Sequence, residues 1–259
     1  MKIAVCVKEV PDAGADRRID PETMRLDRSG DRALNAYDLN AVEEALRLKE
    51  AAGDGEVVLL SMGAEKALDS LRKALAMGAD RAVLITDEAA AGSDLVATSH
   101  VLSQAIAREE ADLVLFGQQA ADSGGAVLWA AVADRLELPV VSQISELELA
   151  DGTVTARRQT EHGYDRIQAP LPAVLAVADS LNEPRYPSLK GIMAAKKKPQ
   201  EVLSLADIGA DAARAGEAGS RTTVTALAEP PQGDVVMIED EGGDSAEKIL
   251  QFLVERKFV

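Results

Sequence analysis

The residues that best fit a binding site lie in Gly117–Ala126, which follows an apolar run and leads into a helical pattern. Glycines at its two ends let backbone N–H groups approach an anion, and a helix N-terminus favours negative charge. These residues predict a phosphate-binding loop. The competing interpretation is an ordinary strand-to-helix turn in which Asp122 or Ser123 caps the helix. Met62-Gly63 ends an earlier apolar run in the same way and leaves the same two interpretations open.

Catalytic motifs are absent from the sequence. It has no G-x-S-x-G nucleophile elbow, no Walker A loop and no H-E-x-x-H zinc motif. Lys8-Glu9-Val10 follows the first apolar run, where a glycine-rich dinucleotide loop would begin. The single cysteine, Cys6, and the two histidines, His100 and His162, show no metal-ligand spacing. We therefore expect a binding protein, with no catalytic residue and no metal site.

Leu189 is a candidate contact residue of a different kind. It is an apolar residue in a segment otherwise rich in proline, arginine, lysine and serine. A leucine framed by polar residues is typical of an interface anchor when it is exposed. A leucine folded back under its own loop fits the same pattern. The lysine run Lys196–Lys198 ends the segment, and a solvated helix end explains it better than an anion site does.

Alternating strand and helix patterns must position these residues. Asn35 is expected to cap the first helix and Gly78 to end the second. Strands that alternate with helices predict a doubly wound, mostly parallel α/β sheet over residues 1–142. Its ligands lie at the carboxyl ends of strands, near a topological switch point. The strand patterns cover residues 3–7, 57–60, 82–85, 113–116 and 140–141, the helical patterns 36–50, 64–77, 94–108 and 124–136, and the loops of interest 8–35, 61–64, 86–93 and 117–124.

The pattern changes after residue 142. Alternating apolar residues flank the turn pair Asp151-Gly152, and residues 166–177 predict one further strand. We expect an antiparallel extension at the edge of the sheet within one domain, residues 1–199. The polar stretch that follows predicts an extended C-terminal arm, residues 200–259, with a terminal helix that docks on its own domain or on a partner.

Charge and composition exclude several classes of partner. The chain has 44 acidic and 28 basic residues and a formal net charge of −16, which repels nucleic acid and anionic membranes. A nucleotide can still bind through local backbone dipoles. No stretch approaches the roughly 18 apolar residues of a membrane span, and the N-terminal apolar run is too short for a signal peptide. These features predict a cytoplasmic protein.

One segment carries a specific family resemblance. Asn182–Tyr186 (NEPRY), Ser188-Leu189 and Ile192–Lys198 resemble the recognition loop and following helix of the electron transfer flavoprotein beta family. Ala41–Glu50 resembles the family's first helix, Lys73–Asp80 is also similar, and Pro170–Val177 fits the end of its diagnostic pattern. The likeness keeps the family's order and spacing over nearly the whole chain.

The resemblance implies an adenine-nucleotide-binding, Rossmann-like subunit of an electron carrier. Its partner would be an alpha subunit that holds most of a shared FAD. The beta-subunit site would hold AMP, or a second FAD in relatives that bifurcate electrons. The heterodimer would accept electrons from dehydrogenases such as acyl-CoA dehydrogenases, in fatty acid oxidation, and pass them to a quinone oxidoreductase. A stand-alone adenine-nucleotide-binding sensor is the alternative, but it leaves the recognition segment and the arm unexplained.

Carried over by position, the resemblance implies two sets of contact residues. The first would line the nucleotide site, and the second would dock on the dehydrogenase with Leu189 as its anchor. The chain departs from the family at Ala126–Trp129, where a polar run is usual, and at Ala13, His162 and Asp165. The nucleotide set is Cys6, Asn35, Ala36, Tyr37, Asp38, Met62, Gly117, Gln118, Gln119, Ala120, Ala121, Asp122, Ser123, Gly124, Gly125, Ala126, Val127 and Leu128, and the docking set is Glu183, Pro184, Arg185, Tyr186, Leu189, Ile192 and Met193.

Overall fold

Apolar runs in the first half of the chain form the central strands of a sheet. In the computed structural model these are β1 (Lys2–Cys6), β6 (Glu56–Met62), β7 (Arg81–Ile85) and β8 (Leu113–Gly117), and β12 (Ala173–Val177) lies beside β8. All residues of β8 and β12 are buried, as expected for parallel strands covered on both faces. The full sheet has the order β11-β10-β9-β12-β8-β1-β6-β7-β13.

The strand order contains a switch point between β1 and β8. From β1 the chain moves outward to β6 and β7, then crosses to the other side of β1 to form β8 and β12. The connections leaving β1 and β8 therefore run in opposite directions, which opens a ligand position at the carboxyl ends of these two strands. The doubly wound α/β fold expected from the sequence is confirmed.

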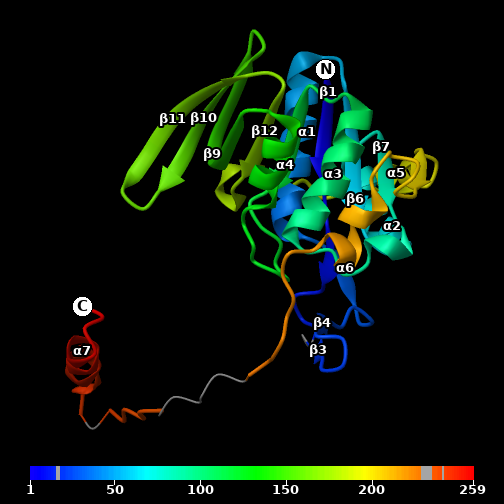
Figure 1. Cartoon of the computed structure of the whole chain (residues 1–259). Coiled ribbons are helices and arrows are strands. Elements are labelled where there is room, and N and C mark those ends of the chain that lie inside the picture. The colour runs from blue at the N-terminus through cyan, green and yellow to red at the C-terminus, as the bar shows by residue number, and fades with distance from the viewer. Residues whose placement is uncertain (16–17, 229–234, 241) are drawn as a thin grey trace. The chain divides into compact units, whose positions relative to one another are not determined.

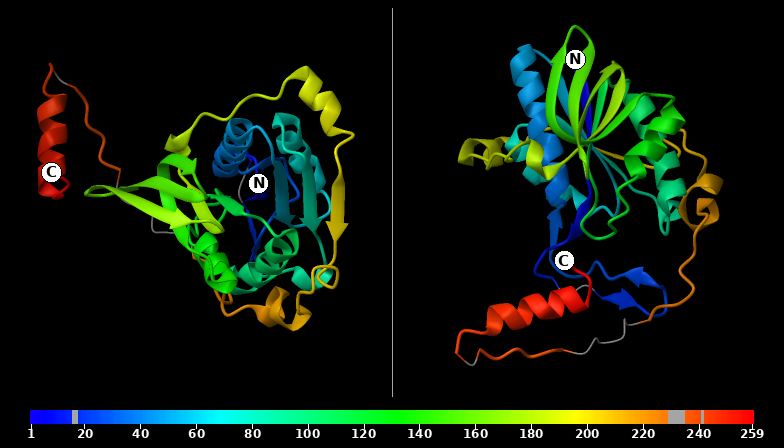
Figure 2. Two further views of the ribbon diagram at one scale, coloured as in Figure 1. Left: turned by 90° about the horizontal axis from the view of Figure 1, so that it is seen from above. Right: turned by 90° about the vertical axis from the view of Figure 1, so that its left-hand side faces the viewer.

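Two helical layers cover the sheet (Figure 2). On one face α1 (Ala36–Ala52) and α2 (Ala67–Met77) pack on one set of alternate strand residues. On the other face α3 (Leu95–Glu109) and α4 (Leu128–Leu136) pack on the opposite set, which includes Cys6. Successive side chains of a strand point to opposite faces, so each central strand contributes to both cores.

An antiparallel meander extends one edge of the sheet, away from the helical layers (Figure 1). It consists of β9 (Val140–Ala150), β10 (Thr153–Thr160) and β11 (Gly163–Pro170), and Asp151-Gly152 forms the predicted turn between the first two, with positive φ at both residues. The prediction of one strand over residues 166–177 is wrong. The chain ends β11 at Pro170 and begins β12 after Pro172, because proline has no N–H to continue a ladder.

The first excursion has its own short ladders. β2 (Glu9–Pro11) pairs with β5 (Arg32–Leu34), and β3 (Ile19–Asp20) pairs with β4 (Arg25–Leu26). The described residues of this excursion therefore include a paired stem and a small hairpin. The structure describes residues 1–15, 18–228, 235–240 and 242–259, so residues 16–17 of this excursion and 229–234 and 241 of the expected arm lie outside the description.

The first unit of the chain extends further than the sequence predicted. β13 (Gln200–Leu203) pairs with β7 as the edge strand, and residues 205–215 bury apolar side chains against the α3 face. The chain therefore divides into Met1–Val224 and Thr225–Val259, with the boundary after Val224 and not at residue 200. The remaining helices are α5 (Leu189–Ala195), α6 (Gly216–Gly219) and α7 (Ser245–Glu255), with single 3-10 turns at Glu88–Ala90, Asp179–Leu181 and Ala212–Arg214.

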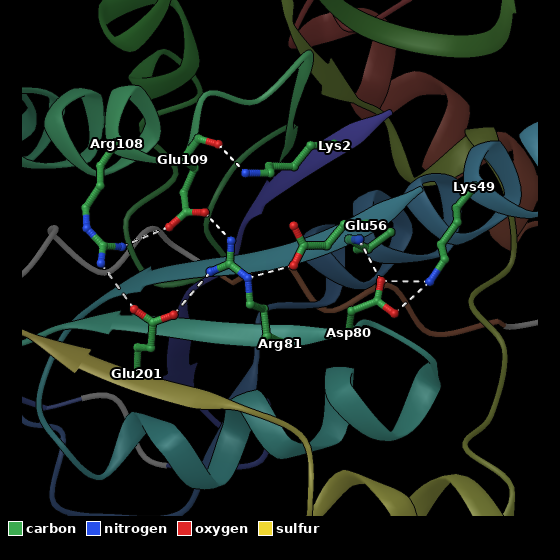
Figure 3. Close-up of polar contacts among 9 residues, drawn as sticks. Lys2, Lys49, Glu56, Asp80, Arg81, Arg108, Glu109 and Glu201 are labelled. Carbon is green, nitrogen blue, oxygen red and sulfur yellow. Dashed lines mark hydrogen bonds and ion pairs between the residues drawn. The ribbon is translucent and has the colours of Figure 1, made fainter. Parts of the chain in front are cut away.

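Ion pairs link neighbouring elements at the amino-terminal ends of the parallel strands (Figure 3). Arg81 begins β7 and pairs with Glu56 at 2.8 Å, with Glu201 at 3.5 Å and with the buried carboxylate of Glu109. Arg108 also pairs with Glu109, at 3.1 Å. The network joins β6, β7, β13 and α3 at the end of the sheet opposite the switch point. None of the described helices is long and apolar enough to cross a membrane.

Candidate functional site

Asn35 joins the start of α1 to the loop that follows β8. Its Nδ2 donates to the carbonyl of Gln119 at 2.8 Å, and its Oδ1 accepts from the N–H of Ala121 at 3.0 Å. The side chain is almost fully buried between the two segments. Asn35 is the N-cap residue of α1, as predicted, but its side chain makes no capping hydrogen bond, because its oxygen accepts from Ala121 instead.

The end of β8 lies directly against the first turn of α1. A Cβ on Gly117 would lie 2.4 Å from Asp38 Oδ1 and 2.7 Å from Asp38 N, so only glycine permits this approach. The buried carboxyl group of Asp38 accepts from the N–H of Lys8 at 2.8 Å. Burial raises the pKa of Asp38 to about 7, against the opposing effect of its hydrogen bonds.

Asp122 connects the loop after β8 to the segment after β1. Its Oδ1 accepts from Lys8 Nζ at 2.8 Å, and its other oxygen pairs with the guanidinium of Arg28. The side chain is 1% exposed. Burial on its own would raise the pKa of Asp122, but the hydrogen bonds and charges of Lys8 and Arg28 lower it. Asp122 therefore does not cap a helix, and Ser123 does not either, because α4 begins at Leu128 and not at the predicted residue 124.

Gly124 and Gly125 form the open part of the loop. A Cβ added to either one would meet no described atom within 4 Å. Gly124 has a φ of +58°, and Ala126 has a φ of +47°, which costs an alanine about 1 kcal/mol. No side chain among the described residues caps the first turn of α4, whose N-cap is Val127. Backbone N–H groups here can therefore receive an anion.

Further bonds hold the other parts of the loop. The N–H of Gln118 donates to Val177 O at 2.9 Å, and Trp129 Nε1 donates to Gln118 O at 3.2 Å. Gln119 Nε2 donates to the hydroxyl of Tyr37 at 3.1 Å. Trp129 thus anchors the beginning of the loop. The N–H groups of Ser123 and Gly124 donate to Ala120 O at 3.2 and 2.8 Å and form a tight turn.

The structure brings most of the expected nucleotide residues together. Asn35–Asp38 and Gly117–Ala121 are in direct contact through the bonds described above. Cys6 ends β1, but its side chain is buried in the core beneath α3 and α4, and burial strongly raises the pKa of its thiol. Met62 ends β6 and is half-buried against the same core. Ala36 is exposed at the start of α1.

Lys8 and Arg28 belong to the site but were not predicted. Lys8 lies two residues after the end of β1, and polar residues at the carboxyl ends of parallel strands are candidates on that ground alone. Arg28 lies in the long excursion, 94 residues from its partner Asp122, and no spacing rule indicates their contact.

The segment after residue 181 exposes a set of apolar side chains. Leu189 is 82% exposed, so it is not folded under its own loop. Lys198 is not free at a solvated helix end, because its Nζ donates to the carbonyls of Leu75, at 2.9 Å, and Ala79. Of the expected docking residues, Tyr186, Ile192, Met193 and Glu183 are also exposed, and Pro184 and Arg185 are half-buried.

Neither histidine lies at the switch point. His100 is buried in α3, and its Nε2 accepts from the N–H of Asp211 at 3.2 Å. Burial, followed by the nearby charges of Arg214 and Arg135, lowers the pKa of His100. His162 is exposed in the turn between β10 and β11.

Comparison with known proteins gives one consistent family. The family model described as "Electron transfer flavoprotein domain" matches residues 23–208. The chain is 40% identical to an electron transfer flavoprotein subunit beta of Mycobacterium bovis, over 99% of both chains. It is 37% identical to the subunit beta of Megasphaera elsdenii over the full length of both. It is 40% identical to a protein of Acetobacterium woodii named "Caffeyl-CoA reductase-Etf complex subunit CarD", over 89% of this chain and 88% of the relative.

Proposed function

Because this chain belongs to the electron transfer flavoprotein beta-subunit family, we propose that it is the nucleotide-binding half of a flavin-carrying heterodimer that moves electrons between other enzymes. Membership implies an alpha subunit as partner and a flavin as the redox group. Proteins of this family are electron carriers. The cytoplasmic location expected from the sequence is part of the same proposal.

The observation that carries the proposal is the loop Gly117–Leu128 at the switch point. It leaves β8 where the strand order reverses, which is where doubly wound sheets bind nucleotides. Gly124 and Gly125 leave room for a ligand to reach the backbone, and the first turn of α4 has no side-chain cap among the described residues. These features fit the phosphates of an adenine nucleotide.

The residues present fit the nucleotide with a restricted set of donors. The loop backbone and the hydroxyl of Ser123 would hold the phosphates, and Asn35, Tyr37 and Gly117 would frame the site. Val127 and Leu128 have no polar side chain, so the backbone would supply most phosphate contacts. We propose AMP or a second FAD for this site, with the shared FAD held mainly by the alpha subunit. A flavin supplies one- and two-electron redox chemistry when bound, and this chain contributes binding and orientation.

The exposed apolar side chains of residues 186–193 support a protein-docking role. Tyr186, Leu189 and Met193 are at least 72% exposed. Large apolar side chains gathered on a polar surface are typical of a site that a partner covers. We propose that this surface docks on dehydrogenases such as acyl-CoA dehydrogenases in fatty acid oxidation, and that the heterodimer delivers electrons to a quinone oxidoreductase. The C-terminal unit, with its exposed α7 residues, would dock on the alpha subunit.

The test is to co-express the chain with a candidate alpha subunit, purify the complex and identify the nucleotides released on denaturation. One FAD and one AMP per heterodimer would support a simple carrier, and two FAD would support a bifurcating one. A monomer that retains an adenine nucleotide without flavin would favour the sensor alternative. Failure to form a complex, or a complex without flavin, would refute the proposal.

A further inference from the structure

The docking segment, defined as residues 182–198, is bound to α1 and α2 by polar contacts, although its apolar side chains are exposed. Tyr186 is 94% and Leu189 is 82% exposed, so neither side chain gains its position from packing within this chain. Their orientation must come from the residues on either side. The strongest contacts of the segment are those of Arg185, which directly precedes Tyr186.

Arg185 binds two carboxylates of α1. Its Nε and one terminal nitrogen donate to the two oxygens of Glu43 at 2.8 and 3.1 Å. The terminal nitrogens also donate to Glu50 at 2.5 and 3.1 Å, and the backbone N–H of Arg185 donates to Glu43 at 3.1 Å. Residues seven apart lie on one face of a helix, so both acids face the segment. A bidentate pair of this kind fixes direction as well as distance.

The charges at this contact are held in their ionised forms. Burial on its own would raise the pKa of Glu43, whose side chain is 5% exposed, but the hydrogen bonds and charge of Arg185 lower it. The hydrogen bond from Arg185 likewise lowers the pKa of Glu50. Arg47 also pairs with Glu43, at 3.1 Å, but from within α1. Removing Arg185 alone would leave a buried carboxylate with one partner.

Three further residues, Asn182, Gly191 and Lys198, hold the ends and the middle of the segment. Asn182 Nδ2 donates to Asn40 O at 3.1 Å and to Glu44 Oε2 at 3.0 Å. Near the middle, α5 rests on the last turn of α2, where a Cβ on Gly191 would lie 2.3 Å from Ala76 O. At the end of the segment, Lys198 Nζ donates to the carbonyls of Leu75 and Ala79, at the carboxyl end of α2. Between Asn182 and Gly191, Arg185 provides the only ion pairs among the described residues.

We propose that Arg185 is a positioning residue that orders the backbone of Tyr186 and Leu189 before they contact a dehydrogenase. The inference rests on the docking role proposed above and adds the residue that controls it. Ordering a loop on binding weakens association, so a segment fixed beforehand binds more tightly. Arg185 does not itself carry electrons. Its loss should therefore weaken docking and leave the rate of the docked complex unchanged.

The experiment uses the purified heterodimer with the dehydrogenase that reduces it. Arg185→Gln is expected to raise KM for the heterodimer about tenfold and to leave kcat within about twofold. Arg185→Lys keeps the charge but loses the bidentate geometry, so its KM should lie between that of the wild type and that of Arg185→Gln. Arg47→Gln is the matched control, because it removes an arginine from Glu43 without touching the segment, and its KM should equal that of the wild type.

Two further measurements separate the possible outcomes. Hydrogen exchange of residues 183–194 in the free heterodimer should become faster in Arg185→Gln, with unchanged nucleotide content. If that variant does not fold, Glu50→Gln removes the charge of the exposed partner of Arg185 and should raise KM to a smaller extent. If Leu189→Ala raises KM and Arg185→Gln does not, the positioning role is overturned and the docking role stands. If neither variant changes KM, the docking role itself fails.

Discussion

Asn35 Nδ2 donates a hydrogen bond of 2.8 Å to the carbonyl of Gln119, which lies 84 residues further along the chain. With the bond from Ala121 to its Oδ1, this side chain ties α1 to the loop after β8. The start of α1 and the segment after β8 are thereby held together. Close by, Gly117 at the end of β8 lies directly against Asp38 in the first turn of α1. This second contact also lies at the switch point.

Replacing Asn35 with Ala should loosen the loop. It removes two partly buried hydrogen bonds, to Gln119 and from Ala121, and we expect a loss of about 2 kcal/mol in the free energy of unfolding. The heterodimer should retain less nucleotide after gel filtration. Gln168→Ala is the control, since it removes an exposed side-chain hydrogen bond to Thr155 in the antiparallel extension. Full nucleotide retention in Asn35→Ala would contradict the assigned role of the loop.

The pKa of Asp38 gives a pH dependence whose sign is defined. Burial raises the pKa to about 7 from the ordinary value of 3.8, so the folded chain binds this proton more tightly than the unfolded chain. Its contribution to stability is therefore complete below about pH 4 and is lost as the pH rises to about 7. The steepest slope is about 1.4 kcal/mol per pH unit. In urea titrations of the full chain between pH 4.5 and 8, Asp38→Asn should gain stability relative to the wild type as the pH rises. Parallel curves for the two proteins would refute the raised pKa.

Leu189→Ala should slow electron uptake from a dehydrogenase. The side chain is 82% exposed, so its removal costs the fold little, and a partner that covers it loses an apolar contact. We expect KM for the heterodimer to rise about tenfold with unchanged flavin content. Val202→Ala, at an exposed position of β13, is the control. Unchanged kinetics in Leu189→Ala would remove this residue from the docking surface.

Asp94→Ala should release the last residues of the first unit. One carboxylate oxygen of Asp94 caps α3 through the N–H groups of Val96 and Ala97, and the other accepts from the N–H groups of Arg221 and Thr222. Burial opposes ionisation of Asp94, but these bonds lower its pKa to about 2. Loss of the cap should cost about 1 kcal/mol. Trypsin should cleave after Arg221 faster than in the wild type, and Asp94→Asn, which keeps an acceptor, should be cut at an intermediate rate. Equal cleavage rates in all three proteins would argue against this anchor.

Arg81→Met should destabilise the fold without affecting the nucleotide site. Arg81 bridges β6, β13 and the buried Glu109 at the amino-terminal end of the sheet (Figure 3). Removing one partner of a buried ion pair costs about 3 kcal/mol. Arg72→Met, which breaks the exposed pair with Asp69, should cost less than about 1 kcal/mol. A loss of nucleotide in the Arg81 variant under conditions where it stays folded would contradict the separation of the two ends.

The sequence by itself determined the central sheet, its helical layers and the place of the loop after β8, which stays a predicted phosphate-binding loop. A strand buried on both faces requires a continuous apolar run, and an amphipathic helix requires apolar residues three or four positions apart. Both patterns can therefore be recognised from the spacing of nearby residues. Gly78 ends α2 with a φ of +145°, as predicted, because a left-handed residue favours glycine. The turn at Asp151-Gly152 was predictable for the same reason. The family resemblance added the expected docking and nucleotide residues.

Only the tertiary structure decided which polar groups meet. Asn35 takes its predicted N-cap position, yet its side chain binds Gln119 and Ala121 and does not cap the helix. Asp122, a cap candidate in the competing interpretation of the loop, binds Lys8 and Arg28 instead. The boundary at residue 200 was wrong for a related reason, since β13 becomes an edge strand only by pairing with β7. Capping preferences are local, whereas these contacts depend on which segments the packed core brings within hydrogen-bond distance. The tertiary structure also decided between the two interpretations of Leu189, whose side chain is 82% exposed and not folded under its own loop.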